Sequence, residues 1–182
     1  RIALEEVGLT PVAPGDHEKL LWEVRGLAHE LGTPRMPQVY DGMAPARAYQ
    51  PVLDGGRRVT TDDLPFVVEV WNDPRVSPNI GGPRPEARLR DRIEEWTRHW
   101  DEHGFGATLF VERETGQAVG WGGLKHSTIG TGPAITVGYV ITPACWGRGY
   151  ATEIARASVR HAHDGLGLDE VRASVLATNA AS

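Results

Sequence analysis

The residues with the clearest chemical potential form a short glycine-containing turn at 146–150, WGRGY. The turn follows an alternating apolar segment and precedes one with helical spacing, so it is expected to join a strand to a helix. Two glycines two residues apart let the main chain bend tightly, so that successive amide N–H groups converge. The first helical turn adds amides without intrahelical acceptors and the positive end of the helix dipole. The segment therefore predicts a site for a phosphate or pyrophosphate.

Two common phosphate-binding motifs do not match this turn. A P-loop needs a lysine followed by serine or threonine, but Tyr150 and Ala151 follow Gly149. A dinucleotide fingerprint needs a third glycine at the position of Thr152 and a parallel βαβ beginning. Neither class of site is expected.

Histidine, cysteine and tyrosine side chains supply the other chemical candidates. His161 and His163 lie two residues apart on a predicted helix and would point to different sides, so no metal site is expected. Cys145, the single cysteine, has no evident base nearby and is expected to be an incidental thiol. His126 and Tyr139 are candidates for proton transfer, although His126 could be an ordinary residue at a strand end and Tyr139 alternates with core positions.

Hydrophobic periodicity predicts the elements that position these residues. Helical spacing and cap signals predict helices over 16–31, 61–71, 86–103 and 151–164. Alternation predicts strands over 106–112, 117–124, 134–141 and 171–177. A first strand within 52–59 is poorly supported, because it contains two adjacent glycines. The expected fold class is α/β, of the mixed α+β kind, with an antiparallel meander followed by a strand–helix–strand unit.

Composition and net charge exclude several classes of protein for this chain. The 182 residues, 40% hydrophobic and 24% charged, fit one globular domain with an extension. The chain shows no membrane-spanning run or secretory signal, and one cysteine allows no internal disulfide, so we expect a cytoplasmic protein without a membrane partner. The net charge of -5 argues against nucleic-acid binding through a basic surface. Residues 51–104 carry 8 basic and 11 acidic side chains, either an ordinary solvated surface or a rim that favours a cationic substrate.

The segment 137–153, VGYVITPACWGRGYATE, resembles the GNAT superfamily of acyl-coenzyme A-dependent N-acyltransferases, whose pyrophosphate loop reads R/Q-x-x-G-x-G/A. It is most similar to the ribosomal-protein N-terminal (Rim-type) acetyltransferase branch, in which WGxGYATE is typical. Further similar segments at 60–76, 103–124 and 167–182 extend the resemblance over about residues 52–182. The resemblance implies a mostly antiparallel sheet with splayed central strands, flanked by helices.

The resemblance also implies roles for individual residues, with acetyl-CoA as cosubstrate and no metal. Main-chain amides of the turn would hold the pyrophosphate of coenzyme A, from Gly147, Arg148, Gly149, Tyr150, Ala151 and Thr152. The pantetheine arm would lie between two splayed strands, with 171–177 on one side and Val140, Ile141 and Thr142 on the other. A main-chain N–H of Tyr139 or Val140 would polarise the thioester carbonyl. Asn179 matches an asparagine that contacts the pantetheine arm, or it caps a following helix.

Two positions depart from the family pattern. Ala144 replaces the arginine or glutamine of the phosphate motif, and Thr136 stands where many relatives have a glutamate. A weak base is tolerable for an α-amine, which with a pKa near 8 is roughly a fifth neutral at about pH 7.4. A weak base slows the reaction more for a lysine-like amine, of which only about a thousandth is neutral at the same pH. Glu69 or a water chain are further candidates to accept the proton.

The ends of the chain fit the family less well. Residues 1–50 form an N-terminal extension of unclear role, and 51–182 form the acetyltransferase domain, without the helix and strand that usually follow. Residues 1–9 resemble that final strand. Three explanations of this resemblance remain open: these residues end an upstream tandem domain, the chain order is rearranged, or the resemblance is a coincidence. Our hypothesis is that residues 4–9 form a strand of the sheet.

Two functions follow from the sequence. The first is transfer of an acetyl group from acetyl-CoA to a primary amine, by direct attack in a ternary complex. The acceptor would be a protein N-terminal α-amine or a small cationic amine. The alternative is a non-catalytic acyl-CoA-binding module. No nucleic-acid partner is expected, and a homodimer is compatible with the sequence.

Overall fold

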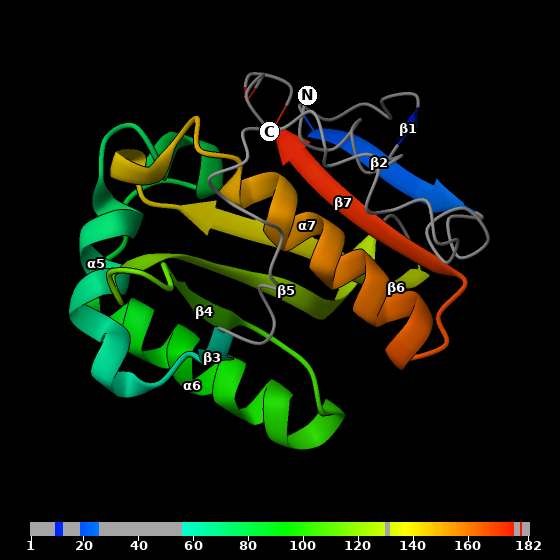
Figure 1. Ribbon diagram of the computed structural model, residues 1–182, viewed down its shortest axis with the longest axis horizontal. Helices are drawn as coiled ribbons and strands as arrows, with labels where there is room; N and C mark the ends of the chain where they lie inside the picture. The colour runs from blue at the N-terminus through cyan, green and yellow to red at the C-terminus, as the bar shows by residue number, and fades with distance from the viewer. Residues whose placement is uncertain (1–9, 13–18, 26–55, 130–131, 177–178, 180–182) are drawn as a thin grey trace.

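One seven-stranded sheet organises the chain, with strand order β1-β2-β7-β6-β5-β4-β3 (Figure 1). The computed structural model describes residues 10–12, 19–25, 56–129, 132–176 and 179. The strands are β1 Thr10–Val12, β2 Lys19–Arg25, β3 Gly56–Arg58, β4 Thr108–Val111, β5 Ala118–Ile129, β6 Gly132–Ile141 and β7 Glu170–Leu176. The helices are α5 Leu64–Asn72, α6 Glu86–His103 and α7 Tyr150–Arg160, with short helical turns at Thr61–Asp63, Ser77–Ile80, Pro143–Cys145 and His161–Gly165. Neighbouring strands are antiparallel except β6 and β7, which run parallel.

Helices cover both faces of this sheet. On one face, Val67 of α5 and Ile93 of α6 are fully buried in a cluster with Leu109 of β4. On the other face, Ile154 of α7 packs in a cluster with Phe110. Leu109 and Phe110 are consecutive residues of one strand, so their side chains point to opposite faces. The result is a helix–sheet–helix arrangement of mixed α/β class, as expected from the sequence.

Most of the elements expected after residue 60 are confirmed. Helix α6 has the expected bounds, 86–103. Helix α7 ends at Arg160 and continues as one π-helical turn over His161–Gly165. Strand β5 runs on to Ile129, beyond the expected end at 124. Within the described residues, strand β3 covers Gly56–Arg58, and a Cβ atom at Gly56 would come within 2.5 Å of the Thr108 methyl carbon.

The helix expected over 16–31 is wrong where the structure describes that segment. Residues 19–25 form β2, which pairs antiparallel with β7 over its whole length, from Lys19↔Leu176 to Arg25↔Glu170. Leu20, Leu21 and Val24 fit helical spacing, but Leu20, Trp22 and Val24 equally fit the spacing of a strand. Pairing with β7, which would otherwise be a sheet edge, decides between the two patterns. The strand hypothesised at residues 4–9 lies outside the described residues.

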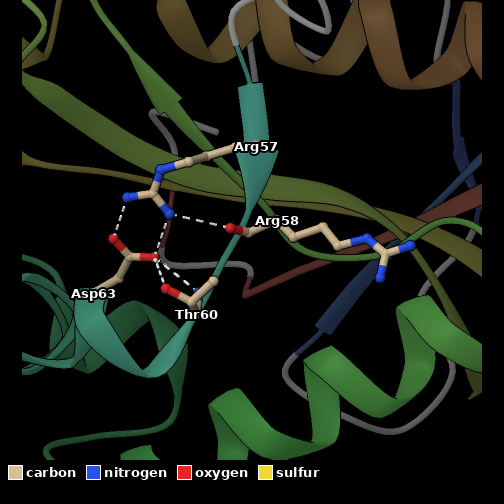
Figure 2. Close-up of polar contacts among 4 residues, drawn as sticks. All are labelled: Arg57, Arg58, Thr60 and Asp63. Carbon is tan, nitrogen blue, oxygen red and sulfur yellow. Dashed lines mark hydrogen bonds and ion pairs between the residues drawn. The ribbon is translucent and has the colours of Figure 1, made fainter.

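An ion pair between exposed Arg57 and buried Asp63 fixes the connection from β3 to α5 (Figure 2). Both guanidinium Nη atoms of Arg57 donate to the Asp63 carboxylate, at 2.5 and 2.7 Å, and the Thr60 main-chain N–H donates to the same group at 2.8 Å. Burial of the Asp63 carboxyl opposes its ionisation, but the hydrogen bonds from Arg57 and Thr60 outweigh this and lower its pKa. The neighbouring Arg58 points away and pairs with exposed Asp101 of α6.

None of the helices in the described part of the chain is long and apolar enough to cross a membrane.

Candidate functional site

The glycine turn, residues 146–149, connects the end of β6 to the start of α7. Gly147 has a φ of +71° and Gly149 a φ of +83°, left-handed conformations that glycine adopts readily. A Cβ atom at either position would meet nothing within 4 Å, so the space beside both residues is open. The Glu153 N–H donates to the Gly149 carbonyl and begins the helical ladder, so the preceding amides have no carbonyl four residues back within the helix. This is the local geometry of an anion-binding helix start.

Two side chains of this segment hold it against the end of β4. The Arg148 guanidinium and the Tyr150 hydroxyl both donate to Oε1 of Glu112, each at 2.5 Å. The Arg148 guanidinium also lies 5.3 Å from the centre of the Tyr150 ring. Both side chains are therefore engaged with Glu112. Glu112 was not a candidate from the sequence, because it reads as an ordinary polar residue where an expected strand ends.

A tryptophan of the turn shows which way the end of β6 faces. The indole N–H of Trp146 donates to the Ile141 carbonyl at 2.8 Å, while the Thr142 N–H donates to the Val119 carbonyl on β5. Main-chain groups alternate in direction along an antiparallel strand, so those of Thr142 and Val140 face β5, and those of Ile141 and Tyr139 face β7. Of the two candidate amides at Tyr139 and Val140, the register directs that of Tyr139 toward β7.

Strands β6 and β7 diverge on the side of the glycine turn. Within the described residues their pairing consists of one register pair, Thr136↔Arg172, so 140–142 lie beyond it. This agrees with the expected splay of the two central strands. Thr136 is buried, and its hydroxyl lies 3.5 Å from the Lys125 carbonyl oxygen. After β7 the Asn179 N–H donates to the Leu176 carbonyl at 2.9 Å, so Asn179 lies at the end of this strand.

Aromatic residues gather on the α5 and α6 face, at Trp121 of β5. The Trp121 ring is stacked on Trp71 at 6.3 Å, meets Phe66 edge-on at 6.1 Å and lies 6.1 Å from Trp96. Trp121 pairs across the sheet with Val140, so this cluster backs the end of β6. A hollow of about 290 Å³ beside Trp71 is lined by charged residues of the loop before α6 and of α6, and no residue of the glycine turn reaches it.

The structure separates the two candidates for proton transfer. Tyr139 packs on the α7 face, with its hydroxyl oxygen buried. His126 pairs across the sheet with Ile135, four register positions from the Gly122↔Tyr139 pair, which is about 13 Å at about 3.3 Å per residue.

His126 instead joins His99 and His103 of α6, and their ligand nitrogens all lie within 4.8 Å of one another. Burial, and then the charges of His103 and His99, lower the pKa of His126. His99 and His103 are not among the residues predicted from the sequence, although their spacing of four on a helix is a usable signal.

Comparison with known families agrees with this geometry. The sequence model of the acetyltransferase (GNAT) domain matches residues 57–182. The chain is 30% identical over 90 residues to the uncharacterized protein YkkB of Bacillus subtilis, which is 48% of this chain and 51% of that protein. It is 29% identical over 124 residues to FsC-acetyl coenzyme A-N(2)-transacetylase of Aspergillus fumigatus, 64% of this chain and 53% of that protein. The chain thus spans about half the length of these curated relatives.

Solved structures show the same fold. The crystal structure of an acetyltransferase from Agrobacterium tumefaciens superposes with a TM-score of 0.55 and 27% identity, over 62% of this chain and 64% of that one. A putative GnaT-family acetyltransferase from Bordetella pertussis also gives a TM-score of 0.55, at 20% identity, over 65% of this chain and 72% of that one.

Proposed function

Because this chain belongs to the GNAT acetyltransferase family, we propose that it transfers the acetyl group of acetyl-CoA to a primary amine. The observation that carries the proposal is the left-handed pair Gly147 and Gly149 directly before the first turn of α7. Open space beside both glycines and amides at a helix start fit a pyrophosphate. The name of the Aspergillus relative specifies acetyl coenzyme A and a nitrogen position, which supports the same chemistry here.

The diverging strands supply the rest of the proposed site. Residues 140–142 of β6 and the end of β7 would flank the pantetheine arm, and Asn179, close to the end of β7, would contact it. The main-chain N–H of Tyr139, directed toward β7, would stabilise negative charge on the carbonyl oxygen under attack. Bound acetyl-CoA supplies an activated thioester, so attack by a neutral amine forms an amide and releases a thiol. The chain would thus act by positioning both reactants in a ternary complex and by hydrogen bonding.

The surroundings of Thr136 favour an acceptor of low pKa. Its buried hydroxyl is no base at neutral pH, and His126 lies too far from the Tyr139 amide to remove the proton directly. With neither of these side chains available as a base, the reaction is faster for an acceptor that has a sizeable neutral fraction at neutral pH. This favours a protein N-terminal α-amine, as in the Rim-type branch, or a small amine of similar pKa, over a lysine side chain.

Acceptor-dependent release of free thiol from acetyl-CoA tests the proposal. Peptides with a free N-terminus and no lysine are compared with the same peptides N-blocked and carrying one lysine. We expect turnover with the first set, little with the second, and none in a Gly147→Glu variant, whose bulk and negative charge occupy the turn. Equal rates for both peptide sets would contradict the acceptor assignment, and unchanged turnover in Gly147→Glu would contradict the cosubstrate site.

Thr136 also supports a second candidate function, a non-catalytic acyl-CoA-binding module. A buried threonine at this position removes the side chain that many relatives would use as a base. Tight binding of acetyl-CoA without thiol release across a broad amine panel would favour this candidate over the enzyme.

A further inference from the structure

Three histidines from two separate elements meet at the end of α6, away from the glycine turn. His99 and His103 lie four residues apart on α6 and share one face of the helix, and His126 comes from β5. The ring centres of His103 and His126 are 4.1 Å apart, and those of His99 and His103 are 4.6 Å apart. Phe105 lies against this histidine cluster, with its ring centre 5.2 Å from both His99 and His126.

The hydrogen bonding of His99 prepares one of its nitrogens to bind an ion. Its Nδ1 lies 2.8 Å from the Phe105 carbonyl oxygen, so that nitrogen carries the proton and the lone pair is on Nε2. A metal-bound histidine commonly has its other nitrogen hydrogen-bonded to a carbonyl in this way. The main-chain N–H of His126 also points at Nε2, at 3.0 Å, so an ion would compete with one hydrogen bond from this amide.

Distances within the cluster suit a small ion that prefers imidazole. A tetrahedral zinc ion with Zn–N bonds of about 2.0–2.1 Å holds its nitrogens about 3.3 Å apart. His99 Nε2 and His126 Nδ1 are 3.2 Å apart, close to that spacing, and hydrogen-bond to each other, so His126 Nδ1 must give up its proton when an ion binds. One ligand nitrogen of each histidine lies within 4.8 Å of the other two, about 1.5 Å more than the zinc spacing, so small side-chain movements close the cluster on an ion. His103 is exposed and at the end of its helix, so a small rotation suffices.

We propose that His99, His103 and His126 form a binding site for one divalent transition-metal ion of the zinc class, with the remaining coordination open to solvent. Imidazole ligands suit Zn²⁺, Co²⁺, Ni²⁺ and Cu²⁺ and exclude Mg²⁺ and Ca²⁺, which prefer oxygen. The site lies at the His126↔Ile135 pair, and the glycine turn follows Ile141 at the far end of β6. The ion would therefore join the end of α6 to β5 and would not take part in cosubstrate binding.

Titration of the chelator-treated full chain with ZnCl2 in a calorimeter tests the site. We expect one ion per chain at micromolar or tighter affinity, and a rise in the unfolding temperature when Zn²⁺ is added. Replacing Zn²⁺ with Co²⁺ gives a second readout, since nitrogen-ligated Co²⁺ absorbs visible light with bands that report its geometry.

Variants locate the ion. His103→Ala and His126→Ala should each weaken binding at least about tenfold and abolish the Co²⁺ bands, because each removes one of three ligands. His161→Ala, which changes a histidine on another helix, is the matched control and should bind Zn²⁺ like the original chain. Absence of saturable binding, or full affinity in His103→Ala, would overturn the proposal. Because His103 is exposed, its variant is expected to fold, and circular dichroism checks this.

Discussion

Gly149 offers the sharpest local test, because its left-handed backbone stands directly before α7. In Gly149→Ala an L-residue must occupy φ +83°, which costs about 1–2 kcal/mol. The variant can relieve this cost by relaxing out of the left-handed conformation, and a ligand that needs the original turn must then restore it. When the relaxation is complete, the ligand must supply the full 1–2 kcal/mol again, so acetyl-CoA binding weakens by up to about 5- to 30-fold.

The assay is calorimetric titration with acetyl-CoA, together with urea unfolding of the same samples. Gly167→Ala is the matched control, since Gly167 also has a left-handed φ, +66°, and open space beside it, but precedes β7 at the other end of α7. Gly167→Ala should lose a similar free energy of unfolding and keep its affinity for acetyl-CoA. Full affinity in Gly149→Ala, or an equal loss of affinity in Gly167→Ala, would contradict a role of the left-handed Gly149 in acetyl-CoA binding.

Further predictions concern the framework that holds the site. Asp63→Ala removes a buried partner of Arg57 and should lower the free energy of unfolding by about 2–3 kcal/mol, measured in urea. Asp101→Ala removes an exposed partner of Arg58 and should lower it by less than about 1 kcal/mol; equal losses would contradict the role given to burial. Folding lowers the pKa of Asp63 below its ordinary 3.8, so its ionic contribution is complete above that pH and is lost as the pH falls through the lowered value. Urea unfolding from pH 6 down to about pH 2 should therefore show a shallower loss of stability below about pH 4 in Asp63→Ala than in the original chain, and parallel curves would argue against the shift. Trp121→Ala, which empties the centre of the aromatic cluster, should cost about 3–5 kcal/mol, and urea unfolding with a loss below 1 kcal/mol would show that the cluster is not core.

Local signals carried most of the successful sequence predictions. Helix α6 was predictable because its apolar spacing and the glycine that ends it, Gly104, are adjacent in sequence. The glycine turn was predictable for the same reason. Glycine lacks a Cβ atom and can adopt a positive φ whatever its sequence neighbours are, and Gly147 and Gly149 both do so. The family resemblance agreed with both and gave the splay of β6 and β7 as well.

Non-local contacts account for what was missed. The apolar residues of β2 fit both the helical period and the two-residue period of a strand, so the sequence alone predicts a helix there. Only the pairing of β2 with β7, which is distant in the chain, selects the strand. The role of Glu112 depends on Arg148 and Tyr150 reaching it across the fold. His126 looked like an isolated strand residue because the histidines that it meets come from α6. These features depend on tertiary packing, which neither periodicity nor motif spacing encodes.

Binding of the acetyl-CoA pyrophosphate by the glycine turn can be measured directly. The most direct measurement compares calorimetric titrations of the full chain with acetyl-CoA and with acetyl-pantetheine, which keeps the thioester and the arm but lacks the pyrophosphate. We predict saturable 1:1 binding of acetyl-CoA that weakens at least about a hundredfold for acetyl-pantetheine, since several charge-assisted hydrogen bonds are lost. Gly147→Glu should bind acetyl-CoA no better than the original chain binds acetyl-pantetheine. Equal affinity for the two ligands, or no binding of acetyl-CoA, would contradict the account.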